Sequence, residues 1–204
     1  MLLTAENISY KYKKNSPWIL KDLSLAIKSG ERVGVVGPSG CGKSTLAKII
    51  AGYEKADEGK ILLDGTLIPR KCFSPVQIIY QHPELAVNPR IKVGYSLKEA
   101  WDPDKEILYR MGIEDDWLKR WPSELSGGEL QRFCIARVLS QETKFLICDE
   151  ITTMLDVITQ AQIWQLLLEI AEERKLGMMI ITHNKHLANR VCTRIVEFPD
   201  INKI

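Results

Sequence analysis

The sequence predicts an α/β fold: an antiparallel β layer at the N-terminus, a core sheet of buried strands, and a small helical subdomain inserted into that core. Apolar side chains recur at every second position in the first strands, most clearly in 23–27. Buried-type apolar runs then alternate with helix-period segments. From Asn88 to Pro122 the sequence has helix-period segments and no strand-like run. We therefore expect one domain, with residues 1–87 and 141–204 forming the β layer and core and residues 88–140 forming the helical subdomain.

The bulk composition is that of an ordinary globular chain. With 204 residues, 45% of them apolar and 26% charged, the chain is long enough for one sizeable core. The formal net charge of +2 is small, and no basic run stands out, so no nucleic-acid partner is expected. No uninterrupted apolar run approaches the ~18–20 residues of a membrane span, and no leader pattern precedes Leu2. We expect any membrane role to be peripheral and to act through a partner.

The cysteines do not form a disulfide framework. An odd number of widely spaced thiols without a Cys-x-x-Cys pair is typical of a reduced, cytosolic protein. The five are Cys41, Cys72, Cys134, Cys148 and Cys192.

The N-terminal strands are joined by turns, at 13–17 and at Ser29-Gly30. Tyr12, at the end of the first strand, is an aromatic side chain that could stack on a nucleotide base. An ordinary strand aromatic explains it at least as well from the residues alone.

A phosphate-binding loop follows the apolar strand 32–36 and precedes a helical pattern at 46–51. Its glycines let the backbone aim successive N–H groups at one anion, and the helix N-terminus adds its positive dipole end. Lys43 is expected to reach the β- and γ-phosphates, and the Ser44 hydroxyl to bind Mg²⁺. The loop consists of Gly37, Pro38, Ser39, Gly40, Cys41, Gly42, Lys43, Ser44 and Thr45.

Gly52 is expected to end the first helix, and 59–65 has the form of a short strand and turn. Gln81 stands at the end of the strand run 76–80, where a polar side chain can face a ligand. The residues alone favour an ordinary loop glutamine. In the helical stretch that follows, tryptophans are expected to anchor packing or to line a groove for a partner helix. They are Trp101, Trp117 and Trp121.

A second phosphate site is indicated at the start of another helical pattern. Ser126 is a natural N-cap with Glu129 three residues on, which is a capping-box arrangement. A well-capped helix accounts for those two residues but not for Gly127 and Gly128, since glycine weakens a helix. Glycines there leave room for an anion at the exposed N–H groups.

Two acids end the apolar strand run that begins at Lys144. Asp149 can hold Mg²⁺ opposite Ser44, and Glu150 can orient or polarise an attacking water. An amphipathic helix is expected from Leu155-Asp156 up to Gly177.

A further strand, 178–181, ends at Thr182-His183. His183 could contact a γ-phosphate or fix the water, although a loop histidine is equally consistent with its position. The spacing of the histidines gives no zinc or nickel site.

These segments resemble the ATP-binding subunits of ABC transporters, in the right order and over nearly the whole chain. Residues 37–45 look like the Walker A loop, 125–131 like the ABC signature and 145–150 like Walker B with its catalytic glutamate. Leu155-Asp156 looks like the D-loop. The Leu-Ser-Gly-Gly signature is the specific part, because other P-loop proteins lack it. The resemblance implies a P-loop NTPase core of the RecA-like kind, with ATP and Mg²⁺ as cofactors.

The same resemblance gives roles to residues that their positions left open. Gln81 is similar to the Q-loop glutamine, with catalytic and metal-binding roles beside Asp149, and His183 to the switch histidine. Tyr12 is similar to the aromatic that stacks on adenine. Glu150, His183 and Gln81 are thus the expected catalytic residues.

The resemblance also implies partners and a location. Two such ATPase domains pair head to tail, as a homodimer or a heterodimer, so Ser126, Gly127 and Gly128 would cover the γ-phosphate bound by the other subunit. The pair would dock beneath integral-membrane permease subunits, with an extracellular substrate-binding protein acting indirectly. The chain would then lie at the cytoplasmic face of the cell membrane as a peripheral subunit.

Shorter segments resemble one branch of the family, the importers of oligopeptides, dipeptides, nickel and metal-chelating metallophores. These are 80–83 with 88–90, 121–128, and 155–157 with 160–162. The alternative is a soluble, non-transport ABC ATPase of the translation or DNA-repair type. Such proteins usually have two cassettes or a large insertion, and this sequence has neither. Three residues depart from the pattern: Ile151, Met154 and His82.

Overall fold

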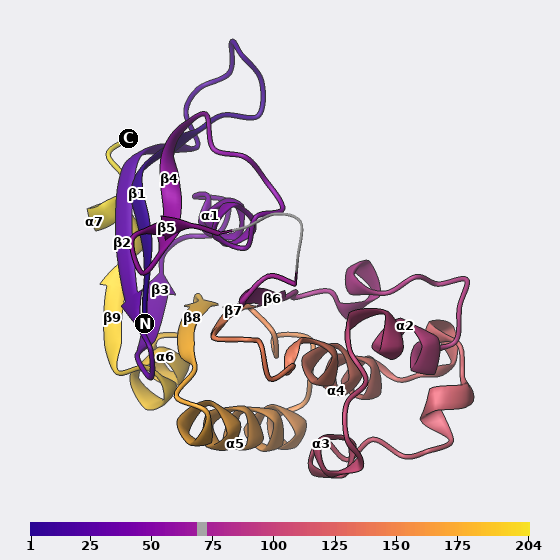
Figure 1. The fold of residues 1–204 in the computed structure, drawn as a ribbon. Coiled ribbons are helices and arrows are strands. Elements are labelled where there is room, and N and C mark those ends of the chain that lie inside the picture. Colours follow the sequence, from indigo (N-terminus) through magenta and orange to yellow (C-terminus); the bar gives the residue numbers. More distant parts are fainter. Residues whose placement is uncertain (69–72) are drawn as a thin grey trace.

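The computed structural model describes residues 1–68 and 73–204, so Cys72 lies outside the described residues. Two sheets form the framework (Figure 1): a four-stranded sheet in the order β2-β1-β4-β5 and a five-stranded sheet in the order β6-β7-β8-β3-β9. The strands are β1 (Leu2–Tyr10), β2 (Leu20–Lys28), β3 (Arg32–Val36), β4 (Glu58–Leu63), β5 (Thr66–Leu67), β6 (Val76–Ile79), β7 (Phe145–Asp149), β8 (Gly177–Thr182) and β9 (Arg194–Glu197). The α-helices are α1 (Lys43–Ile50), α2 (Val93–Ala100), α3 (Lys105–Arg110), α4 (Gly127–Val138), α5 (Val157–Glu173), α6 (Lys185–Val191) and α7 (Phe198–Ile201).

The expected antiparallel layer is confirmed. Strand β1 pairs with β2 through the loop at 13–17, with Leu2 opposite Lys28. Strand β4, expected only as a short strand, pairs with the other edge of β1 and is antiparallel to it. The α/β fold class is therefore confirmed, with an antiparallel sheet beside a parallel one.

The central strands of the parallel sheet are buried on both faces, and the alternation of their side chains separates two cores. Phe145 and Ile147 of β7 face a core that contains α1 and the antiparallel sheet. Leu146 and Cys148 of the same strand face a core that contains α4 and α5. This period-2 division is what a central strand requires when both faces are covered. Helix α1 consequently lies between the two sheets (Figure 1).

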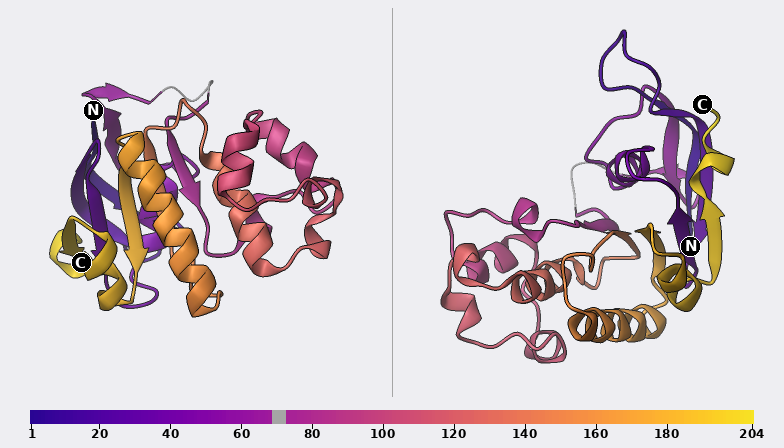
Figure 2. Two further views of the ribbon diagram at one scale, coloured as in Figure 1. Left: turned by 90° about the horizontal axis from the view of Figure 1, so that it is seen from below. Right: turned by 180° about the vertical axis from the view of Figure 1, so that it is seen from behind.

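The chain between β6 and β7 contains helices and no strands, in agreement with the expected helical subdomain. Figure 2 shows this part, α2 to α4, standing to one side of the sheets. Its buried residues, such as Val93 and Ile107, belong to the same hydrophobic core as Ile163 and Leu167 of α5. The helical part therefore packs as an extension of the core. Boundaries at 88 and 140 stay a prediction.

The expected end of the long helix was wrong. Helix α5 ends at Glu173, before the end that we had placed at Gly177, and Lys175, with φ of 53°, takes the left-handed conformation that follows it. Gly177 instead starts β8, where a Cβ would lie 2.4 Å from ring atoms of Phe145. Phe198 begins α7 directly after β9, and neither α6 nor α7 had been predicted from the sequence. Within the described ranges, no helix combines the length and apolar character needed to cross a membrane.

Candidate nucleotide site

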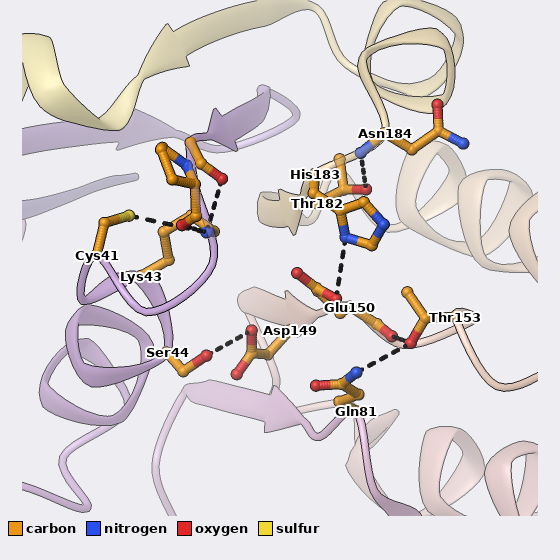
Figure 3. Close-up of polar contacts among 12 residues, drawn as sticks. Cys41, Lys43, Ser44, Gln81, Asp149, Glu150, Thr153, Thr182, His183 and Asn184 are labelled. Carbon is orange, nitrogen blue, oxygen red and sulfur yellow. Dashed lines mark hydrogen bonds and ion pairs between the residues drawn. The ribbon is translucent and has the colours of Figure 1, made fainter.

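The register of the parallel sheet brings the predicted site residues to one edge. Ile79 of β6 pairs with Cys148, Asp149 of β7 pairs with Ile181, and Val36 of β3 pairs with Thr182. The residues that follow these pairs therefore emerge together at the carboxyl ends of the strands, where α/β sheets bind ligands. They are Gln81, Glu150, His183 and the loop that starts at Gly37 (Figure 3).

The loop at Gly37–Thr45 closes around its own lysine. Lys43 is buried, and its Nζ donates to the carbonyl oxygens of Gly37 at 2.9 Å and Pro38 at 2.6 Å. The Cys41 Sγ lies 3.8 Å from the same Nζ. Gly42 has φ of 110°, a conformation that side chains rarely adopt. The ammonium is thus held at the centre of the loop and at the start of α1, where an anion would be bound.

Ser44 and Asp149 meet across the gap between the loop and β7. The Ser44 hydroxyl donates to Asp149 Oδ1 at 3.1 Å (Figure 3). Burial raises the pKa of Asp149 above its usual range, and the hydrogen bond from Ser44 opposes that shift. A hydroxyl and a carboxylate side by side are the hard oxygen donors that suit Mg²⁺. No cluster of three or more His, Cys, Asp or Glu side chains among residues 1–68 and 73–204 could hold a metal, so further ligands would have to include phosphate oxygens or water.

Glu150 leaves the strand in a strained conformation. Its φ of 49° lies in the left-handed region, and its N–H donates to Ile181 O at 3.1 Å. The side chain lies beside His183, with Glu150 Oε2 3.2 Å from the ring Nδ1. The turn that carries His183 is fixed by Asn184 N–H, which donates to Thr182 Oγ1 at 3.0 Å. The backbone thus holds the carboxylate and the imidazole together.

Gln81 joins this group through a residue that the sequence had not singled out. Its Nε2 donates to Thr153 Oγ1 at 3.2 Å, and that hydroxyl donates to Glu150 O at 3.0 Å (Figure 3). A hydroxyl bonding to the carbonyl three residues back is a common local motif, so the spacing of Thr153 from Glu150 was the available signal. Gln81 is therefore linked to the backbone of Glu150.

Tyr12 lies beside the loop. Its hydroxyl is 2.8 Å from Thr45 Oγ1, while its side chain is 62% exposed. The ring also makes an edge contact with Tyr10, at a centroid distance of 5.3 Å. An exposed aromatic face held next to the phosphate loop suits stacking on a base.

The segment Ser126–Gly128 does not join the other site residues. The Ser126 hydroxyl accepts from Glu129 N at 3.3 Å, and Glu129 Oε2 accepts from Ser126 N at 2.6 Å, which confirms the capping box. Gly127 is exposed, with open space where a Cβ would lie. The turn therefore presents its backbone outward, at the N-terminus of a 12-residue helix.

The three departures from the family pattern have different surroundings. Ile151 is buried, whereas Met154 is exposed at the entrance to α5. His82 Nδ1 lies 3.1 Å from Glu84 Oε1. None of the three displaces a group of the Lys43–Asp149–Glu150 constellation.

A phosphate loop, two acids at a neighbouring strand end and a Ser-Gly-Gly helix start, on a parallel sheet backed by an antiparallel one, define an ATP-binding cassette. Comparison with known proteins agrees. The ABC transporter family matches residues 20–153, and the chain belongs to that family. It is accordingly an ABC-type ATPase, which binds and hydrolyses ATP.

Curated relatives are named for import. The nickel import ATP-binding protein NikE of Escherichia coli strain 536 is 36% identical, over 96% of this chain and 82% of its own length. The oligopeptide transport ATP-binding protein OppF of Haemophilus influenzae is also 36% identical, over 84% of this chain and 59% of its own length.

Solved structures agree with the fold. A bacterial ABC transporter cassette in dimeric form superposes with a TM-score of 0.79 at 28% identity, covering 96% of this chain and 93% of that one. Its post-hydrolysis state bound to ADP and Pi gives 0.77 at 26% identity, with the same coverage. The cbiO1 subunit of Clostridium perfringens gives 0.75 at 29% identity, covering 95% and 82%.

Proposed function

We propose that the chain is the ATP-hydrolysing subunit of an importer for peptides or for nickel and metal chelates. The observation that carries this proposal is the 36% identity to a nickel import protein over 96% of the chain, supported by the same identity to an oligopeptide transport protein. The decisive measurement is uptake of radiolabelled nickel and of labelled oligopeptides by cells with and without the gene. Loss of neither uptake would contradict the proposal.

We infer the following roles within one site. The loop N–H groups and Lys43 bind the phosphates of ATP, and the Tyr12 ring stacks on adenine. Glu150 accepts a proton from the attacking water, and His183, 3.2 Å from that carboxylate, helps hold the water in line. Ser44, Asp149 and Gln81 would hold Mg²⁺, which neutralises charge on the phosphates when bound. Removal of Mg²⁺ with EDTA should abolish hydrolysis, and added Mg²⁺ should restore it.

We propose that two ATPase subunits pair head to tail, with Ser126, Gly127 and Gly128 of each completing the site of the other. Support comes from the open space at Gly127 and from the dimeric form of a related cassette. Backbone N–H groups at a helix N-terminus can bind a γ-phosphate there. Ser126→Arg should impair hydrolysis at the partner's loop while this chain still binds ATP. Loss of this chain's own ATP binding would contradict the shared site.

Docking to permease subunits is proposed for a groove between β6 and the helical part. The groove has a volume of about 440 Å³, and its lining includes Tyr53, Tyr80, Leu85, Ala100 and Arg137. Tyr53 is 64% exposed and Leu85 is 73% exposed, so apolar surface is available to a partner helix. We propose that the chain thereby sits at the cytoplasmic face of the membrane, with a substrate-binding protein acting indirectly.

Co-purification tests this placement. The chain should be recovered with integral-membrane permease subunits, and Leu85→Asp should reduce that recovery without changing ATP binding. Recovery with ribosomes or DNA and with no permease would instead favour a soluble, non-transport ATPase.

A further inference from the structure

The phosphate loop is backed at both ends by residues that do not belong to it. A Cβ on Gly37 would lie 3.0 Å from the Cβ of Phe198, and a Cβ on Gly42 would lie 3.0 Å from Ile19 Cγ2 and 3.1 Å from Ile19 O. Phe198 is fully buried, and it begins α7 directly after β9. The first and last glycines of the loop therefore rest on two segments that are remote in sequence.

Asn202 ties these two segments together. Its Oδ1 accepts from Lys21 N at 2.8 Å, and its Nδ2 donates to Ile19 O at 3.1 Å. The N–H of Lys203 donates to Lys21 O at 3.0 Å, which extends the same contact. Figure 1 shows α7 beside β2, so the end of the chain runs past the start of that strand. One primary amide thus uses its donor to hold the Ile19 carbonyl that lies against Gly42, and its acceptor to hold the N–H of Lys21 two residues further on.

The same contact reaches the residues before the loop. The N–H of Ile19 donates to Tyr10 O at 2.8 Å, which joins the start of β2 to the end of β1, next to Tyr12. The Tyr12 hydroxyl in turn lies 2.8 Å from Thr45 Oγ1. Fixing the position of Ile19 therefore helps to fix two parts of the site: Gly42 at the phosphates and, through Tyr10, the segment that carries Tyr12 and its proposed contact with the base.

We infer that Asn202 is a positioning residue for nucleotide binding, acting through Ile19 on Gly42. It touches no reacting group; its effect is to keep the loop N–H groups converged on the phosphates. Preorganised donors bind more tightly than donors that must be ordered during binding. The inference rests on the proposed assignment of Gly37–Thr45 as the ATP phosphate site.

The test is nucleotide affinity in the purified full chain, measured by titration with a fluorescent ATP analogue. Asn202→Ala removes both side-chain hydrogen bonds to β2. We expect its dissociation constant for ATP to rise by about 3- to 10-fold, the loss expected for one or two modest hydrogen bonds. The kcat of the assembled ATPase at saturating ATP should stay within about 2-fold of wild type, because no catalytic group moves.

A second variant covers the case in which Asn202→Ala folds poorly. Asn202→Asp keeps an acceptor for Lys21 N but replaces the donor to Ile19 O with a carboxylate oxygen, which repels that carbonyl oxygen. It should raise the dissociation constant at least as much as Asn202→Ala, and the unfolding temperature of each variant, measured beside its affinity, separates loop positioning from global stability.

The matched control is Lys203→Ala. Lys203 is next to Asn202 in the chain, and this substitution removes the ion pair of Lys203 with Asp22 but keeps the backbone hydrogen bond to Lys21. The variant should bind ATP as the wild type does. Three results would overturn the inference: unchanged affinity in both Asn202 variants, an equal loss in Lys203→Ala, or a fall in kcat at unchanged affinity. Lys43→Ala tests the loop assignment separately, since wild-type affinity in that variant would refute the assignment itself.

Discussion

The two phosphate-facing regions of this chain are built in opposite ways. At the loop and the neighbouring strand ends, polar side chains bond within this chain: Lys43 bonds to backbone carbonyls of the loop, Ser44 to Asp149, and Glu150 to His183. At the Ser126 turn, the side-chain bonds stay within the capping box, and Gly127 faces open space. The first region, which we call the organised region, is held together by the fold of this chain. The second, which we call the outward-facing turn, is suited to act on a group that another chain supplies.

The difference can be tested with substitutions that separate chemistry, loop geometry and the outward-facing turn. Glu150→Gln and Gly127→Ala are each tested by ATP binding to this chain and by hydrolysis in the assembled ATPase. Gly42→Ala is tested by ATP binding alone, and Thr153→Val by kcat.

Removing the proposed base should have the largest effect. Glu150→Gln keeps the shape of the side chain but cannot accept a proton, so kcat should fall by about 10²- to 10⁴-fold. ATP binding should be nearly unchanged, because Lys43 and the loop are intact. The measurement is steady-state phosphate release beside an ATP titration. Unchanged turnover would refute the role of Glu150.

Strain in the loop should act on binding. Gly42→Ala places a Cβ at φ of 110° and 3.0 Å from Ile19 Cγ2. The left-handed backbone and the close contact together cost about 1–3 kcal/mol, which corresponds to roughly a 5- to 150-fold loss of ATP affinity if the loop rearranges to relieve them. Gly65→Ala is the matched control, since Gly65 also has positive φ but has no atom within 4 Å of an added Cβ. Equal losses of ATP affinity in the two variants would show that backbone strain at a positive φ explains the effect, without the contact between the added Cβ and Ile19.

A substitution in the outward-facing turn should lower hydrolysis in the dimer and leave ATP binding by this chain unchanged. Gly127→Ala meets open space, so the fold should be unaffected or more stable by up to about 1 kcal/mol, because alanine favours a helix. This chain should bind ATP normally, while hydrolysis in the assembled dimer falls by about tenfold, because the added methyl group obstructs the approach of a phosphate. Wild-type hydrolysis in the dimer would contradict a phosphate-binding role for this turn.

The parts of the site that the sequence predicted are those formed by neighbours in the chain. The loop, the acid pair at the end of β7 and the Ser126–Glu129 capping box all depend on spacings of a few residues. Sequence position left Gln81, His183 and Tyr12 open, because only the register of the parallel strands brings the first two to the same edge as Glu150. Asn202 and Phe198 gave no signal, since their contacts join opposite ends of the chain.

The error at Gly177 has the same origin. A glycine after a helical pattern is most simply explained as a helix end, because glycine readily adopts the left-handed conformation. The actual constraint is a Phe145 ring from another strand, 2.4 Å from where a Cβ would lie. A glycine is indeed required at position 177, but the requirement comes from packing against another strand and not from the end of a helix. Local propensity could not show this, because the contact with Phe145 is tertiary.

Thr153 offers the finest test of the organised region, because it contributes one hydroxyl between Gln81 and Glu150. Thr153→Val keeps the side-chain volume and removes both hydrogen bonds, whereas Thr153→Ser keeps the hydroxyl. We expect kcat to fall by about 3- to 10-fold in the valine variant, the cost of one or two modest hydrogen bonds, and to recover in the serine variant.

The control for this substitution is Thr193→Val, at the opposite edge of the sheet, where the lost hydroxyl bonds only to the backbone of Arg32. It should lower stability without changing kcat. If Thr153→Val and Thr193→Val change kcat alike, the hydroxyl of Thr153 supports only the fold. If Thr153→Val lowers kcat and Thr153→Ser restores it, the organised region extends from the phosphate loop to Gln81 through the Thr153 hydroxyl. Among the described residues, the turn at Ser126 has no comparable hydrogen bond to the rest of the site.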